Sequence, residues 1–221
     1  MKNSSFAEKL RSLDRTDSHL LIVSKTRPIE DIVAYYELGH RDFGENRVQE
    51  LEMKALALKE SCPEIRWHMI GHLQSNKVNN LFQVPNLYAV HSVDDQSLAE
   101  KLVKSQDKLA QKLRIFLQFN TSREVEKSGF ETYAELRTAA ELIHSAENLE
   151  LAGLMTMGTL RTEDFEAEAR RCFQKLNELK TRLETEMNVQ LETSMGMSQD
   201  YKIALEENSS WIRLGTMMFQ D

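Results

Sequence analysis

The chain has 221 residues, of which 41% are hydrophobic and 29% are charged, with only 8 Gly and 3 Pro. This composition predicts a soluble globular protein and excludes a disordered or fibrous one. The net charge of −7 argues against a broad nucleic-acid surface or an anionic membrane as the partner.

No apolar stretch approaches the roughly 18 residues of a transmembrane helix, and residues 1–13 contain no apolar signal core. The two cysteines, Cys62 and Cys172, form no CxxC motif, which argues against a disulfide framework or a cysteine-based zinc site. Cys172 lies on an apolar helical stripe and is expected in the core. We therefore expect a cytoplasmic protein.

The first half of the chain alternates short apolar runs with amphipathic ones. Residues 19–25 are apolar on both faces, which is typical of a strand buried in a parallel sheet. Pro28 and the apolar spacing after it predict a helix that ends near Gly39. The further elements expected here are a strand ending at 42–46, a helix over 47–59, strands over 66–71 and 87–91, and a helix whose apolar stripe includes Leu98, Leu102, Leu109 and Leu113.

The second half continues the same alternation. Strands are expected over 114–120, 149–156, 189–193 and 211–214, with helices through Leu136, Ala140 and Ile143, over 165–187, and between the last two strands. Eight strands that alternate with helices favour a single (β/α)8 barrel domain over residues 1–221. The alternative, an open doubly wound sheet, would normally carry a Gly-rich turn after its first strand, and none follows Lys25.

Functional groups in such a barrel lie at the C-terminal ends of the strands. The residues found there are Lys25, Glu45, Asn46, His72, Asn120, Met155, Ser194 to Ser198 and Arg213 to Thr216. Lys25 follows a buried strand, and partial desolvation there would leave more neutral amine to attack a carbonyl. The alternative is a solvated lysine that only closes the strand.

Two glycine turns end the seventh and eighth predicted strands. Ser194–Ser198 leads into a short helix, and Leu214-Gly215-Thr216 adds a hydroxyl donor. Loops after these two strands often build the phosphate site of a barrel, and free N–H groups favour an anion. Each glycine could instead simply close its turn.

His68 and His72 have the spacing of a metal motif. The run lacks the glutamate of HExxH, however, and it has the pattern of a strand rather than a helix. We therefore expect a packed His68, a loop His72 and no metal site.

Taken together, these motifs resemble the pyridoxal phosphate homeostasis protein family. The runs that carry the resemblance extend in order from about Leu20 to Phe219, and they are 23–26, 43–50, 67–77, 127–129, 153–155, 194–198 and 213–216. This sequence departs from the family pattern at His72, where many members have proline, at Gln220 and Asp221, and in a short segment before Leu20.

The resemblance implies a barrel of the alanine-racemase type, fold type III, that carries pyridoxal 5′-phosphate. By that likeness Lys25 forms the Schiff base, and Arg213 approaches either the pyridine nitrogen or the phosphate. Asn46 is a further expected contact with the cofactor. The residues that would surround the phosphate are Ser194, Gly196, Met197, Ser198, Gly215 and Thr216.

The function implied is that of a monomeric cofactor-holding protein in vitamin B6 balance, without substantial catalysis. Apo-enzymes that use pyridoxal phosphate are its expected protein partners. One alternative is an amino-acid racemase, which in this resemblance also needs a second domain and a tyrosine base, and we expect neither in a chain that ends at Asp221. Another is a lysine-dependent aldolase without a cofactor.

Overall fold

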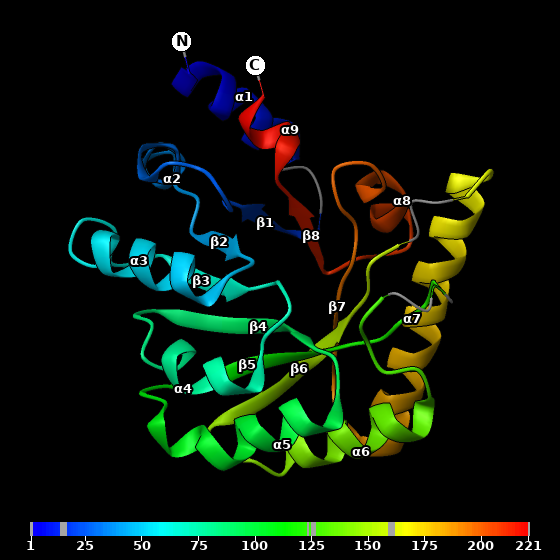
Figure 1. Cartoon of the computed structure of the whole chain (residues 1–221). Coiled ribbons are helices and arrows are strands. Elements are labelled where there is room, and N and C mark those ends of the chain that lie inside the picture. The colour runs from blue at the N-terminus through cyan, green and yellow to red at the C-terminus, as the bar shows by residue number, and fades with distance from the viewer. Residues whose placement is uncertain (1, 14–16, 123, 125–126, 159–161, 221) are drawn as a thin grey trace.

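The protein forms a closed barrel of eight parallel strands that pair in chain order, with the helices outside it (Figure 1). The computed structural model describes residues 2–13, 17–122, 124, 127–158 and 162–220. The strands are β1 (His19–Val23), β2 (Asp42–Glu45), β3 (Arg66–Met69), β4 (Leu87–Val93), β5 (Leu113–Gln118), β6 (Leu149–Met155), β7 (Glu192–Ser194) and β8 (Trp211–Leu214). The predicted barrel is thereby confirmed.

Pairing between the first and last strands closes the barrel. In this pairing His19 lies opposite Trp211 and Ile22 lies opposite Leu214. The two ends of the chain also lie side by side (Figure 1). There the Phe6 and Phe219 rings meet edge to face, with their centroids 6.0 Å apart.

Helices return the chain from the C-terminal end of each strand to the start of the next, and two more helices, α1 and α9, lie before the first strand and after the last one. The helices are α1 (Lys2–Leu13), α2 (Ile29–Glu37), α3 (Val48–Leu58), α4 (Val78–Leu81), α5 (Gln96–Ser105), α6 (Tyr133–His144), α7 (Phe165–Met187), α8 (Tyr201–Glu206) and α9 (Thr216–Phe219). Their ends follow local rules: Thr132 and Glu135 form a capping box on α6. At the C-terminal end of α7, Asn188 adopts a left-handed conformation that stops the helix.

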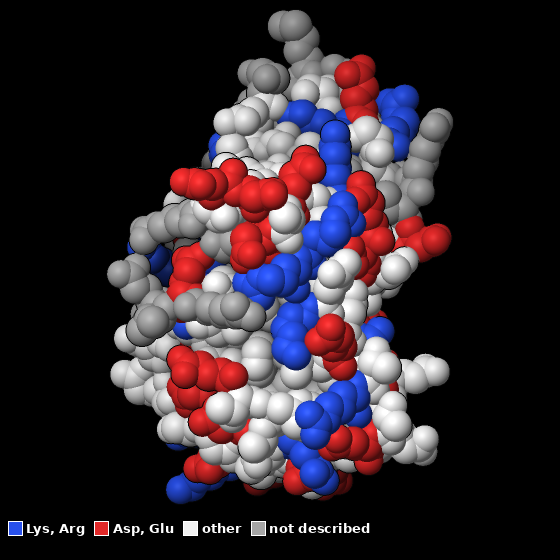
Figure 2. All heavy atoms as spheres, turned by 90° about the vertical axis from the view of Figure 1, so that its right-hand side faces the viewer, with Lys and Arg blue, Asp and Glu red and all other residues white. Residues whose placement is uncertain are grey.

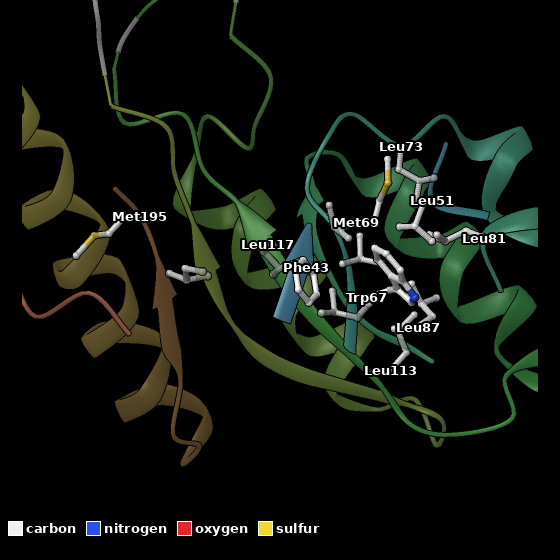
Figure 3. Packing of buried hydrophobic residues seen from close by; sticks show 14 of the residues in the cluster. Phe43, Leu51, Trp67, Met69, Leu73, Leu81, Leu87, Leu113, Leu117 and Met195 are labelled. Carbon is white, nitrogen blue, oxygen red and sulfur yellow. The ribbon is translucent and has the colours of Figure 1, made fainter. Parts of the chain in front are cut away.

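The largest apolar core lies between the strands and the helices (Figure 3). Trp67 and Phe43 project outward from neighbouring strands, and Leu51 of α3 packs in the same cluster. Inside the barrel there is a smaller apolar cluster formed by Leu21, Ala89, Phe116, Ala152, Met155 and Trp211. The described barrel interior also contains buried polar side chains, among them His68, His91, Ser194 and Arg213.

Two details differ from the expectations. The helix expected through Leu113 ends at Ser105, and Leu113 begins β5 instead. A short 3-10 turn, Gln106–Lys108, breaks the helix, and Gln106 Oε1 accepts a hydrogen bond from the Asn148 N–H. The helix α1 was not predicted, because its apolar residues are few and are recognisable as buried only against α2 and α9.

The surface on the side of α7 is mixed in charge. Figure 2 shows a narrow band of Lys and Arg flanked by Asp and Glu. Helix α7 contributes ion pairs between residues on adjacent helical turns, such as Lys175 with Glu178 and Arg182 with Glu186. Among the described residues, no helix has both the length and the apolar character needed to cross a bilayer.

Candidate functional site

A cavity of about 480 Å³ opens at the C-terminal ends of the strands. This volume is in the range of small-molecule sites. Seven of the nine residues predicted for the site line it, and they are Lys25, Asn46, Met197, Ser198, Arg213, Gly215 and Thr216. Residues that are almost 200 positions apart in the chain are therefore brought to one cavity.

The other two predicted residues, Ser194 and Gly196, lie behind the cavity wall. Ser194 is fully buried, because its side chain points into the barrel interior. Gly196 has φ +94°, and a Cβ there would lie 2.5 Å from the Cβ of Ala204. Gly196 is thus required by the packing of its turn on α8. Neither Ser194 nor Gly196 is among the residues that line the cavity, and their place around the phosphate stays a prediction.

Lys25 lies at the cavity mouth on the loop between β1 and α2. Its side chain is exposed. The loop itself is held from beneath by Lys54 of α3, which is only 2% exposed. Lys54 Nζ donates hydrogen bonds to Ser24 O (2.8 Å), Glu45 Oε1 (2.8 Å) and Glu50 Oε1 (2.7 Å).

This buried cluster fixes both neighbours of Lys25. The Ser24 hydroxyl donates to Glu45 Oε1 at 2.7 Å. On the other side, the Thr26 N–H donates to Glu50 Oε1 at 2.6 Å. Thr26 has φ +61°, a left-handed conformation that is uncommon for a β-branched residue. The bond to Glu50 therefore helps to stabilise an unfavourable backbone conformation directly after Lys25.

The electrostatics of the cluster are unequal on its two carboxylates. Burial raises the pKa of Glu45, against the hydrogen bonds from Lys54 and Ser24. Burial acts in the same direction on Glu50, but the hydrogen bonds from Lys54 and Thr26 lower its pKa below the ordinary value. Lys54 is the one cation within ion-pair distance of either carboxylate among the described residues.

Arg213 reaches the cavity from the floor. Its Nη1 donates to Ser194 Oγ at 2.7 Å and its Nη2 donates to Thr156 O at 2.9 Å. Burial lowers the pKa of Arg213 to about 10, while the Asp200 carboxylate acts in the opposite direction. Within the described part of the chain the guanidinium forms no ion pair, so a cation at the cavity floor is left without a close anionic partner.

The turns after β7 and β8 form an anion-binding wall. The N–H groups of Ser198, Gln199 and Gly215 have no acceptor among the described residues, and all three residues line the cavity. The Met197 N–H, in contrast, donates to Asp200 Oδ1 at 2.5 Å. Burial raises the pKa of Asp200, which favours its neutral acid and reduces repulsion of a bound anion.

Sequence reasoning named His72 as a strand-end residue but missed two other residues that line the cavity, Asp94 and Gln118. His72, which is largely exposed, has its Nδ1 2.9 Å from Oδ2 of the buried Asp94. Gln118 donates to Ser128 O at 2.8 Å and thereby ties the loop after β5 to the cavity wall. Asp94 and Gln118 both lie at a strand end, and the same rule that selected Lys25 could have found them.

Some strand-end residues have other roles. Asn120 binds within its own loop, to Glu124 O and Lys127 O. Met155 is buried in the small cluster inside the barrel. His68 is fully buried and His72 lies in a loop, as expected. No metal-binding group of His, Cys, Asp and Glu is found among the described residues.

The fold and this site define a class of protein. The family model of the alanine racemase N-terminal domain matches residues 5–221. Alanine racemase from Clostridium difficile superposes with a TM-score of 0.79 at 12% identity, and the match covers all of this chain and 56% of that chain. At this identity the likeness extends to the fold alone.

Closer relatives narrow the class. The protein of Mus musculus named pyridoxal phosphate homeostasis protein is 39% identical over 222 residues, covering 97% of this chain and 81% of the relative. The protein of the same name from Vibrio alginolyticus is 40% identical over 202 residues, covering 90% and 84%. The chain belongs to the pyridoxal phosphate homeostasis protein family, as its motifs predicted.

A solved structure supports the same assignment. PipY of Synechococcus elongatus, determined with pyridoxal phosphate bound, has a TM-score of 0.85 and 32% identity to this chain. The match covers 97% of this chain and 100% of PipY.

The Lys54 cluster leads to a prediction about stability. Replacement of Lys54 by Met leaves two carboxylates near each other without their cation, and loss of one partner of a buried ion pair costs about 3–5 kcal/mol. We expect the free energy of unfolding, measured by urea denaturation, to fall by about that amount. Hydrogen exchange at the Thr26 and Arg27 amides should accelerate as well.

Lys59→Met is the matched control, because Lys59 lies just beyond the same helix and is exposed. Its effect should stay within about 0.5 kcal/mol. Equal losses in the two variants would contradict the role assigned to the buried cluster.

Proposed function

We propose that this protein binds pyridoxal 5′-phosphate in the cavity at the C-terminal ends of the strands and takes part in vitamin B6 homeostasis. The observation that carries the proposal is the meeting of three groups in one cavity: the amine of Lys25, the buried guanidinium of Arg213, and backbone N–H groups without an acceptor. Membership of the family and the ligand of PipY support it.

Lys25 is the proposed attachment point. When bound, pyridoxal phosphate supplies an aldehyde that condenses with a primary amine. Lys25 is the one lysine among the described residues that line the cavity. Its loop is held by the Lys54 cluster, so the amine is exposed to an incoming ligand while its backbone is fixed.

The phosphate is proposed to bind at the opposite wall. The hydroxyl groups of Ser198 and Thr216 and the N–H groups of Ser198, Gln199 and Gly215 provide several donors there without a formal charge. Backbone donors of this kind suit a phosphate in a protein whose net charge is −7. Met197 would contribute to the wall through its position rather than through its N–H.

Arg213 and Asn46 are proposed to contact the rest of the ligand. Arg213 rises from the floor of the cavity, where we place the pyridine nitrogen; contact with the phosphate is the alternative. The Asn46 side chain has no hydrogen-bond partner among the described residues and lines the same cavity. A cation beside the pyridine nitrogen would disfavour its protonation and weaken the ring as an electron sink.

We further propose that the protein holds this ligand without substantial catalysis, as one unit formed by residues 1–221. The alternative is a racemase, which the family model of the alanine racemase N-terminal domain favours. A racemase needs a base on each face of its substrate. The described residues that line the cavity include no tyrosine for the face opposite Lys25.

The cysteines bear on the cellular location. Cys62 and Cys172 are free and buried, which suits the reducing cytoplasm. We propose that the protein acts there as a monomer. Its protein partners would be apo-enzymes that need pyridoxal phosphate.

The attachment point can be tested by mass. Borohydride treatment of protein mixed with pyridoxal phosphate should add the reduced ligand to the peptide that contains Lys25. Lys25→Ala should abolish the addition with little loss of stability, because the side chain is exposed. Lys77→Ala, on a loop at the same end of the barrel but outside the cavity lining, is the control and should label normally. Labelling of Lys25→Ala at the normal level would show that another lysine is used.

The phosphate-binding wall can be tested by comparing two ligands. Replacing Ser198 by Ala together with Thr216 by Val removes two hydroxyl donors, and each hydrogen bond to an ionised acceptor is worth roughly 1.5–3 kcal/mol. The affinity for pyridoxal phosphate should therefore fall at least about tenfold, while the affinity for pyridoxal should change little. Equal losses for the two ligands would mean general damage to the cavity.

Absence of substantial turnover can be tested with single-enantiomer amino acids. Protein loaded with pyridoxal phosphate should leave their chirality unchanged when it is followed by chromatography. Racemisation on the order of 1–10³ s⁻¹ that disappears in Lys25→Ala would make the racemase assignment correct.

A further inference from the structure

Five side chains form a continuous hydrogen-bonded line through the inside of the barrel. At the cavity end, Arg213 Nη1 donates to Ser194 Oγ at 2.7 Å. Ser194 Oγ lies 2.8 Å from His91 Nδ1, and His91 Nε2 lies 3.0 Å from His68 Nδ1. At the other end, His68 Nε2 lies 3.0 Å from Asp42 Oδ1. We call Arg213, Ser194, His91, His68 and Asp42 the axial line.

The axial line crosses the barrel from one face to the other. Arg213 lies near the C-terminal end of β8 and lines the cavity. Asp42 is the first residue of β2, at the opposite face, where Arg66 pairs with its second carboxylate oxygen. The line therefore connects the proposed binding cavity with the face of the barrel that is farthest from it.

The two rings of the axial line are tightly confined. Both histidines are fully buried. The His91 ring stacks on Phe116, with centroids 4.2 Å apart and planes 8° from parallel. The His68 ring lies 5.1 Å from the indole of Trp211 and 5.2 Å from the Tyr88 ring. Neither ring has room to change its hydrogen-bond partners.

The chemistry of the two ends gives the line a direction. Arginine can only donate, and an ionised carboxylate can only accept. His68 must then donate from Nε2 to Asp42, and in a neutral ring its Nδ1 is left as an acceptor for a proton on His91 Nε2. His91 Nδ1 in turn accepts from the Ser194 hydroxyl. Burial of both rings favours their neutral forms, and with both rings neutral every link is satisfied when each ring carries its proton on Nε2.

The charges around the rings agree with this arrangement. Burial lowers the pKa of His68 against the hydrogen bond and the charge of Asp42, and the nearby Arg66 and Arg114 act in the same direction as burial. Burial lowers the pKa of His91 well below its ordinary value, with further contributions from His68, Arg213 and Arg114. The hydrogen bonds from His68 and Arg66 outweigh burial at Asp42 and lower its pKa, which keeps the acceptor end ionised.

We propose that the axial line is a positioning device: Asp42, His68 and His91 hold Ser194 as an acceptor and thereby fix the orientation of the Arg213 guanidinium at the cavity floor. The inference rests on the proposed function in one respect, namely that Arg213 contacts the ligand. It explains why the barrel interior contains a polar line where a (β/α)8 barrel ordinarily packs branched apolar residues. It also predicts that a change at Asp42 affects the cavity at the far end.

The arrangement of protons can be measured in the unaltered protein without any ligand. Nitrogen-15 NMR of the imidazole rings should show His68 and His91 as neutral Nε2–H tautomers at neutral pH, and both should stay neutral as the pH falls through the ordinary pKa of histidine. The six histidines can be assigned with single His→Gln variants at the other positions. An Nδ1–H tautomer in either ring, or protonation of either ring near its ordinary pKa, would overturn the proposed direction.

Coupling along the line is tested by Asp42→Ala. This variant removes the final acceptor, so the nitrogen signals of His91, which does not touch Asp42, should change. The dissociation constant for pyridoxal phosphate should rise about fivefold, the equivalent of one hydrogen bond, while borohydride still attaches the ligand at Lys25. Glu64→Gln, which removes a carboxylate paired with Arg41 on the surface, should change neither quantity.

The possible failures are distinguishable. If the unaltered protein does not bind pyridoxal phosphate, the proposed function fails. The tautomers of His68 and His91 then still show whether the hydrogen bonds of the axial line have the proposed direction. If the unaltered protein binds the ligand and a folded Asp42→Ala keeps both the affinity and the His91 signals, the axial line has no positioning role. If Asp42→Ala does not fold, the tautomer measurement alone decides.

Discussion

Pairing between the first and the last strand is the constraint on which the site depends. When β1 and β8 pair with Ile22 opposite Leu214, the loop that carries Lys25 is placed beside the turn of Gly215 and Thr216. Because all eight strands are parallel, their C-terminal ends lie on one rim of the barrel. An amine, a guanidinium and two glycine turns from opposite ends of the chain can therefore act on one small molecule.

The closed barrel also determines where polar groups can be buried at low cost. Apolar side chains fill most of the layer between strands and helices (Figure 3). Inside the barrel, His68 and His91 are buried completely, and burial of a polar group is unfavourable unless it is hydrogen-bonded. In the line from Arg213 to Asp42, each buried polar side chain forms a hydrogen bond with the next one. These hydrogen bonds also hold the guanidinium of Arg213 in place at the cavity floor.

Lys25 is organised by a different principle. Its amine is exposed, and what is buried is the cluster of Lys54, Glu45 and Glu50 beneath its loop. Such a cluster specifies one geometry, because both carboxylates share Lys54, and its removal would leave them without a cation. The reactive group can thus remain accessible while Thr26, the residue that follows it, is held in a left-handed conformation. Two polar networks, one on each side of the barrel wall, position the two charged groups of the cavity.

The sequence by itself determined the barrel and seven of the residues that line the cavity. Apolar runs identify the strands, since burial on both faces requires continuous hydrophobic residues, and strand ends then identify Lys25, Asn46, Ser198, Arg213 and Thr216. It could not assign Leu113 to a strand, because a helical stripe and the start of a buried strand both consist of spaced leucines. Only the tertiary structure decided that Ser194 faces the barrel interior, that His68 meets His91, and that Lys54 lies under Lys25. These contacts join residues from different strands and helices, and their geometry is set by strand register and helix packing, which no local pattern of residues encodes.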